Sequence, residues 1–97
     1  MLKLYTQPKC FYCNIMKELL NNTLHTYQII DIKEDPKAFE FVKSQGHTTV
    51  PQLYYNDIHL NKDDTSSYTS DKLNNIINIA INQTEWPWQD SGIEQGM

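Results

Sequence analysis

The sequence is poor in the residues that would define several classes of protein. It has two cysteines in 97 residues, so it cannot supply the four thiolate ligands of a common structural zinc site. Its histidines are scattered and form no pair of zinc-finger spacing. No apolar run reaches the roughly 18 residues of a membrane-spanning helix. We therefore expect neither a structural metal nor contact with a membrane.

Positive charge is also scarce. The formal net charge is -4 and the lysines are dispersed along the chain, so no surface for nucleic acid is expected. The first residues lack the basic, apolar and small-residue pattern of a secretion leader. A protein with two cysteines and no leader suits the reducing cytosol, where such a pair is usually catalytic or redox-sensing. We expect a cytoplasmic monomer whose cysteines carry the chemistry.

The two cysteines lie in Cys10-Phe11-Tyr12-Cys13, where a predicted strand leads into a predicted helix. A thiol at the start of a helix meets unpaired backbone N–H groups and the positive end of the helix dipole, which both favour the thiolate. Cys13, about one helical turn further on, can attack a mixed disulfide formed at Cys10. The spacing predicts thiol–disulfide exchange, and its plainest alternative is a pair of unrelated buried cysteines.

Apolar periodicity and turn residues divide the chain into seven elements. Asp35 and Pro36 have the residue types of a helix N-cap and first helical position, and Gly46 is a typical stop. The order is β-α-β-α-β-β-α, with parallel first strands and a final hairpin. It predicts an α/β thioredoxin fold, a four-stranded mixed sheet flanked by three helices. Strands are expected at 2–5, 27–32, 52–55 and 58–60, and helices from about 12 to 22, 36 to 45, and from 70 onward.

With this plan in place, the chain resembles the small dithiol glutaredoxins, most of all those encoded by bacteriophages. The resemblance runs from residue 1 to about 82, so we expect one domain at 1–83 and a tail at 84–97. It implies that Cys10 attacks a protein disulfide or a glutathionylated cysteine and that Cys13 resolves the mixed disulfide. The residues that carry it are Tyr5-Thr6, Cys10-x-Tyr12-Cys13, Lys17, Asp31-Ile32, Asp35-Pro36, Gly46 and Thr49-Val50-Pro51-Gln52.

The family's Thr-Val-Pro tripeptide implies a binding site for glutathione, the expected reductant. Its proline is cis and lies against the active-site cysteines, so we expect a cis bond before Pro51. The cysteinyl backbone of glutathione would pair with Val50 in strand fashion, beside Thr49. Tyr12 would flank the disulfide, and Lys9 either adds a cation near the thiolate or is solvated.

The γ-glutamyl carboxylate of glutathione is expected at the start of the last helix, as anions are at helix N-termini. That start consists of Thr69, Ser70 and Asp71, and Asp71 could also meet the glutamyl ammonium. The family's Gly-Gly pair before this site is missing. Counted from the hairpin, residues 61–62 take the place of this pair. Counted back from the start of the last helix, residues 66–67 take it, and we favour this second alignment.

Three other departures from the family affect the prediction. Phe11 replaces the common proline of Cys-Pro-Tyr-Cys, so the family's redox potential cannot be transferred. Gln7 replaces a lysine, and Thr48, next to His47, replaces an arginine. Fewer cations therefore face the glycyl carboxylate of glutathione. The tail contains Trp86 and Trp88, which either pack on the domain or dock on a partner.

Residues 66–71 also resemble a segment of the glutaredoxin-like hydrogen donors of class Ib ribonucleotide reductases, which accept electrons from thioredoxin reductase. Thioredoxin reductase is therefore an alternative source of electrons, although the Thr49–Gln52 segment favours glutathione as the reductant. A second alternative is a carrier of a [2Fe–2S] cluster shared between two subunits, and a third is an interaction module that only retains the fold. Ribonucleotide reductase is an expected client by resemblance only.

Overall fold

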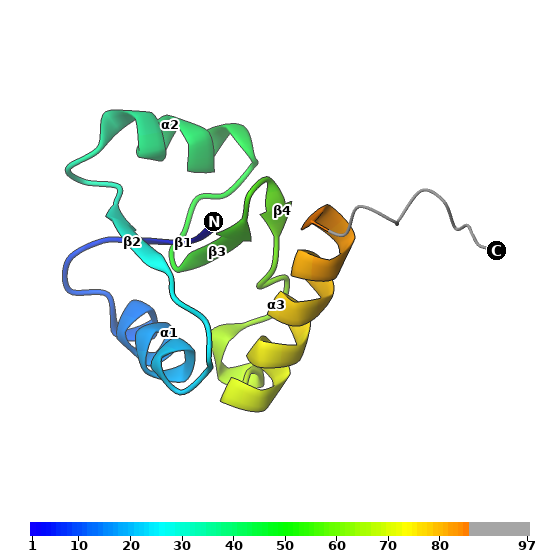
Figure 1. Cartoon of the computed structure of the whole chain (residues 1–97). Coiled ribbons are helices and arrows are strands. Elements are labelled where there is room, and N and C mark those ends of the chain that lie inside the picture. The colour runs from blue at the N-terminus through cyan, green and yellow to red at the C-terminus, as the bar shows by residue number, and fades with distance from the viewer. Residues whose placement is uncertain (86–97) are drawn as a thin grey trace, which may run out of the picture.

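The computed structural model describes residues 1–85, including the side chains of 1–83; the tail tryptophans lie outside this range. Four strands form one mixed sheet in the order β2–β1–β3–β4 (Figure 1). β1 runs parallel to β2 and antiparallel to β3, and β3 is antiparallel to β4. The mixed sheet expected from the sequence is confirmed. The strands are β1 (Leu2–Thr6), β2 (Gln28–Asp31), β3 (Gln52–Tyr55) and β4 (Ile58–His59).

Three α-helices of the described chain flank this sheet: α1 (Phe11–Asn21), α2 (Pro36–Ser44) and α3 (Ser70–Glu85). α1 and α3 pack together on one face of the sheet, and α2 covers the opposite face (Figure 1). A short 3₁₀ helix, η1 (Thr65–Ser67), precedes α3. The layers are those of the thioredoxin fold. No helix of the described chain is long and apolar enough to cross a membrane.

Alternation along the central strands divides the core between the two faces of the sheet. Leu4 and Leu53 are fully buried on the α1/α3 side, whereas Tyr5 and Tyr54, one residue further along each strand, pack on the α2 side. Among the described residues, the hydrophobic cluster on the α1/α3 side contains eleven buried residues and the cluster on the α2 side contains four. His59 is the cross-strand partner of Tyr54, so it lies on the thinner α2 side, with its ring 5.0 Å from the tyrosine ring.

The helix boundaries follow local chemistry. The Asp35 carboxylate accepts hydrogen bonds from the amides of Lys37 and Ala38 at 3.1 and 3.2 Å, with Pro36 in the first helical position. Gly46 has a φ of +87° just after α2, which an L side chain rarely adopts. The predicted start and stop of α2 are confirmed.

The last helix continues further than the apolar pattern indicates. α3 runs to Glu85, and no glycine or proline interrupts the sequence between 70 and 85. The domain boundary expected between residues 83 and 84 thus falls inside α3. The polar connection between β4 and this helix contains η1.

Candidate active site

The two-cysteine motif occupies the turn from β1 into α1. Lys9 has a positive φ of 60° and Cys10 takes the extended N-cap conformation, with φ -100° and ψ 108°. The Cys13 amide donates a hydrogen bond to the Cys10 sulfur over 3.1 Å. A backbone donor and the positive end of the helix dipole stabilise negative charge on a sulfur in this place. Once the disulfide is reduced, this geometry favours a thiolate at Cys10.

The two cysteines differ in access. They are joined by a disulfide, with Cα atoms 5.1 Å apart. Cys13 is only 1% exposed, whereas Cys10 is half-buried. An incoming thiol or disulfide can therefore reach the Cys10 sulfur while Cys13 stays covered by the protein.

The Thr49–Pro51 loop lies against this disulfide. The Val50–Pro51 peptide bond is cis, as expected, and the Val50 carbonyl oxygen is 3.9 Å from the Cys10 sulfur. Among the residues that the structure describes, none accepts a hydrogen bond from the Val50 N–H. Val50 therefore offers a backbone donor and a backbone acceptor beside the reactive sulfur.

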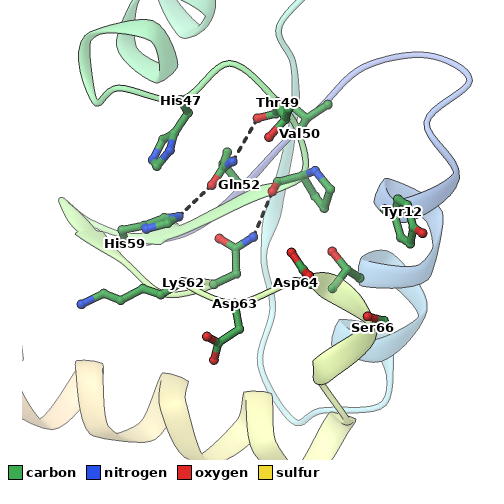
Figure 2. Close-up of a pocket in the computed structure, with 13 residues that line it drawn as sticks. Tyr12, His47, Thr49, Val50, Gln52, His59, Lys62, Asp63, Asp64 and Ser66 are labelled. Atoms are coloured by element: carbon green, nitrogen blue, oxygen red, sulfur yellow. Dashed lines mark hydrogen bonds between the residues drawn. The ribbon is translucent and has the colours of Figure 1, made fainter.

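A groove of about 640 Å³ opens beside this loop (Figure 2). Tyr12 of α1 lies at one side, and residues 61–66, which follow β4 and include the first two residues of η1, form the wall opposite the loop. The surface is polar for the most part and open to solvent. Its lining residues are Tyr12, His47, Thr49, Val50, Pro51, Gln52, His59, Asn61, Lys62, Asp63, Asp64, Thr65 and Ser66.

Four of the residues expected to bind substrate line this groove: Tyr12, Thr49, Val50 and Pro51. Tyr12 is 52% exposed, and its ring lies edge-on to that of Phe11 with centroids 5.2 Å apart. Lys9 is exposed next to Cys10 and is not among the lining residues.

The start of α3 lies outside the groove. The Thr69 hydroxyl accepts a hydrogen bond from the Lys72 amide at 3.1 Å, which makes it a cap of the helix. The Ser70 hydroxyl donates to the Leu19 carbonyl at 2.9 Å and so ties α3 to α1. Asp71, which follows, is exposed and does not line the groove. The groove wall is built from residues 61–66, earlier in the chain than the helix start that the sequence singles out.

The wall carries charges of both signs. Lys62, Asp63 and Asp64 are all exposed. Lys72 Nζ lies 3.9 Å from Asp63 Oδ2, and the two side chains are 47% and 64% exposed. Because water screens such a pair, it contributes little to stability. The Asp63 amide donates to the buried Tyr68 hydroxyl at 3.0 Å. The backbone of the wall is therefore anchored in the core, while its charges remain in water.

The sequence interpretation missed the histidine pair in this region. The rings of His47 and His59 lie 4.4 Å apart, although the residues are twelve positions apart in sequence. His47 Nε2 is 2.7 Å from the Tyr54 hydroxyl. Burial lowers the pKa of His59, and the neighbouring His47 lowers this pKa further. The one available signal was the register of the predicted hairpin, which sets His59 across from Tyr54.

The described residues contain no group of three or more His, Cys, Asp or Glu side chains that could hold a metal ion. The chemistry that the site supports is reversible oxidation of the Cys10 and Cys13 thiols, because the two sulfurs already form a disulfide and one of them can be reached from solvent. The protein is a thiol–disulfide oxidoreductase built on a thioredoxin fold.

Known proteins place it in a particular family of such enzymes. The family model for glutaredoxin matches residues 2–60, more than half of the chain. Glutaredoxin 3 of Escherichia coli strain K12 is 33% identical over 60 residues, which cover 61% of this chain and 72% of that protein. The chain belongs to the glutaredoxin family.

Solved structures agree on the fold. The glutaredoxin-like NrdH-redoxin of Escherichia coli superposes with a TM-score of 0.59 at 19% identity, covering 80% of this chain and 92% of that one. Reduced glutaredoxin C1 of Populus tremula x tremuloides superposes with a TM-score of 0.53 at 17% identity, over 81% of this chain and 65% of its own. At these identities the likeness concerns the fold and not the substrate.

Proposed function

We propose that this protein reduces protein disulfides or glutathionylated cysteines with glutathione as its reductant. The observation that carries the proposal is the backbone of Val50. Its carbonyl oxygen is 3.9 Å from the Cys10 sulfur, and within residues 1–85 its N–H has no hydrogen-bond acceptor. A cysteine-containing peptide whose sulfur reacts at Cys10 can pair with both groups in strand fashion. Glutathione is such a peptide.

The reaction follows from the different access of the two sulfurs. The Cys10 thiolate attacks the substrate disulfide, forms a mixed disulfide and releases the first substrate thiolate, which takes up a proton. Deprotonated Cys13 then attacks the Cys10 sulfur, releases the second substrate thiol and closes the disulfide across a Cα separation of 5.1 Å. One glutathione thiolate reopens that disulfide at Cys10, and a second attacks the glutathionyl sulfur. Glutathione disulfide leaves and the dithiol is restored.

The groove wall suits the γ-glutamyl end of glutathione. Asp63 and Asp64 line the groove and can receive its ammonium group. We place the ammonium group of this end at residues 63–66, and the backbone N–H groups at the start of α3 remain the proposed place of its carboxylate, because anions bind at helix N-termini. Tyr12 lies beside the groove where it can cover the sulfur of the bound peptide.

The test is turnover of a glutathionylated peptide with glutathione and glutathione reductase, beside a parallel assay with thioredoxin reductase alone. We expect turnover in the first assay. Turnover in the second assay only would replace glutathione by the alternative that residues 66–71 suggest. A ribonucleotide reductase with an oxidised active-site disulfide is the client to try first, and an absorption spectrum of the purified protein tests for a [2Fe–2S] cluster.

A further inference from the structure

Two side-chain amides hold the backbone on either side of Val50. Gln52 Nε2 donates to the Thr49 carbonyl at 3.0 Å, and Asn61 Nδ2 donates to the Pro51 carbonyl at 2.9 Å. Both side chains are buried, with 8% exposure each. Figure 2 shows the Gln52 side chain between His59 and the loop, with its hydrogen bond to Thr49 dashed. The carbonyls before and after Val50 are thus fixed by the protein. The Val50 carbonyl lies beside the Cys10 sulfur, and no described residue accepts a hydrogen bond from the Val50 N–H.

Asn61 does this by continuing the hairpin with its side chain. The Leu60 amide makes a backbone hydrogen bond to the Leu53 carbonyl at 2.9 Å. One residue later, Asn61 Oδ1 accepts from the Leu53 amide at 2.8 Å while its Nδ2 donates to Pro51. The side-chain amide therefore replaces the peptide group of a paired strand. A residue without a side-chain amide could not make both of these hydrogen bonds.

Gln52 is oriented by His59. The Gln52 oxygen Oε1 lies 2.7 Å from His59 Nε2. A carbonyl oxygen only accepts hydrogen bonds, so His59 Nε2 must carry the proton. With its oxygen engaged there, the Gln52 amide nitrogen is directed to the Thr49 carbonyl. His59, on β4, thus fixes which end of Gln52 meets the loop (Figure 2).

We propose that Asn61 and Gln52 are positioning residues that preorganise Val50 for pairing with the peptide backbone of the disulfide substrate, with His59 orienting Gln52. Ordering a backbone segment during binding costs conformational entropy. A loop already held at Thr49 and Pro51 avoids that cost. The inference rests on the proposed pairing of substrate with Val50 and adds the groups that make Val50 ready for it.

The variants to test are Gln52→Met and Asn61→Ala, which remove the donors without adding charge. Gln28→Met and Asn78→Ala are matched controls, because both residues are exposed and lie on β2 and α3. Each protein is reduced beforehand and mixed with one of two probes. The first is a glutathionylated peptide, and the second is an aromatic disulfide without amide groups.

We expect the second-order rate constant with the glutathionylated peptide to fall about threefold to tenfold in both variants, the range of one hydrogen bond. The rate constant with the amide-free disulfide should stay unchanged, which also shows that the variant is folded and that Cys10 reacts. The controls should match the wild type with both probes. Equal losses with both probes, or no loss with the peptide, would overturn the positioning role.

A second readout needs no substrate. The ¹⁵N relaxation order parameter of the Val50 amide should fall in Gln52→Met and Asn61→Ala and not in the controls, and an unchanged value overturns the proposal. A fall in order without a loss of peptide rate also overturns it, because the loop would then be held for a reason other than the substrate. Failure of the proposed function would appear separately, as absent turnover of the wild type with glutathione and glutathione reductase.

Discussion

The two sides of the redox centre are assembled in different ways. On the α1 side, Cys10 and Cys13 lie three residues apart, and their relation is set within one helical turn. On the loop side, Val50 is forty residues from Cys10, and its neighbours are held by hydrogen bonds from Gln52 and Asn61. Bond exchange thus rests on contacts within one helical turn, whereas the substrate recognition that we propose for Val50 depends on a loop brought to Cys10 from forty residues away.

The largest effect should come from the reacting sulfur of the α1 side. Cys10→Ser should reduce exchange with every disulfide substrate to the uncatalysed rate, since the accessible thiolate is gone. The measurement is turnover of a glutathionylated peptide and of a protein disulfide, with thermal unfolding as the control for folding. Activity in Cys10→Ser together with inactivity in Cys13→Ser would reverse the assignment of the two cysteines.

Cys13→Ser should separate two reactions that share Cys10. We expect reduction of protein disulfides to be lost, because the buried thiol that resolves the mixed disulfide is missing. Removal of glutathione from a glutathionylated peptide should persist, since free glutathione can attack the same intermediate. Comparing both variants on both substrates shows whether Cys13 acts only in resolution.

The loop side can be tested through the substrate. A glutathionylated peptide in which the cysteinyl amide of glutathione is methylated cannot donate to the Val50 carbonyl. Its KM should rise about threefold to tenfold, with a smaller change in kcat, as expected for loss of one hydrogen bond. The same reagent should react with a small free thiol as fast as its unmethylated parent. An unchanged KM would show that the Val50 carbonyl is not used in binding.

A substitution outside both the α1 side and the loop side of the redox centre should change the stability of the protein and leave its exchange rate unchanged. Asp35→Ala removes the side-chain cap of α2 and should lower the free energy of unfolding by about 1 kcal/mol. Urea unfolding measures the loss, and the exchange rate of the folded protein should equal that of the wild type. A reduced exchange rate would show that α2 is coupled to the redox centre.

The smallest effect is a dependence of stability on pH at the edge of the loop side. Burial and His47 lower the pKa of His59 from its ordinary value of 6.5. The unfolded chain therefore takes up a proton at this residue before the folded protein does. Neutral His59 therefore contributes to the free energy of unfolding. This contribution is complete above pH 6.5 and is lost as the pH falls through the lower pKa of His59 in the folded state. Urea unfolding of the wild type should show this decline, and His59→Gln should show a smaller slope.

Local chemistry in the sequence was enough to determine the α1 side. A proline and a lysine before Cys10, a helical apolar pattern after it, and a partner cysteine one turn later already specify a reactive sulfur at a helix start. The Asp35–Pro36 start and the Gly46 stop of α2 were readable for the same reason, because capping involves residues only a few positions apart.

The loop side, to which we assign substrate recognition, was decided by the tertiary structure. The tripeptide around Pro51 could be identified by its resemblance to a family, but the groups that hold it could not. Asn61 reaches Pro51 across the β3–β4 hairpin, and the groove wall is formed by residues 61–66, ahead of the start of α3. A side-chain amide can replace a paired strand only where the sheet brings it opposite two free peptide groups. Sequence spacing does not encode that proximity; the register of β3 and β4 and the packing of α3 against the sheet create it.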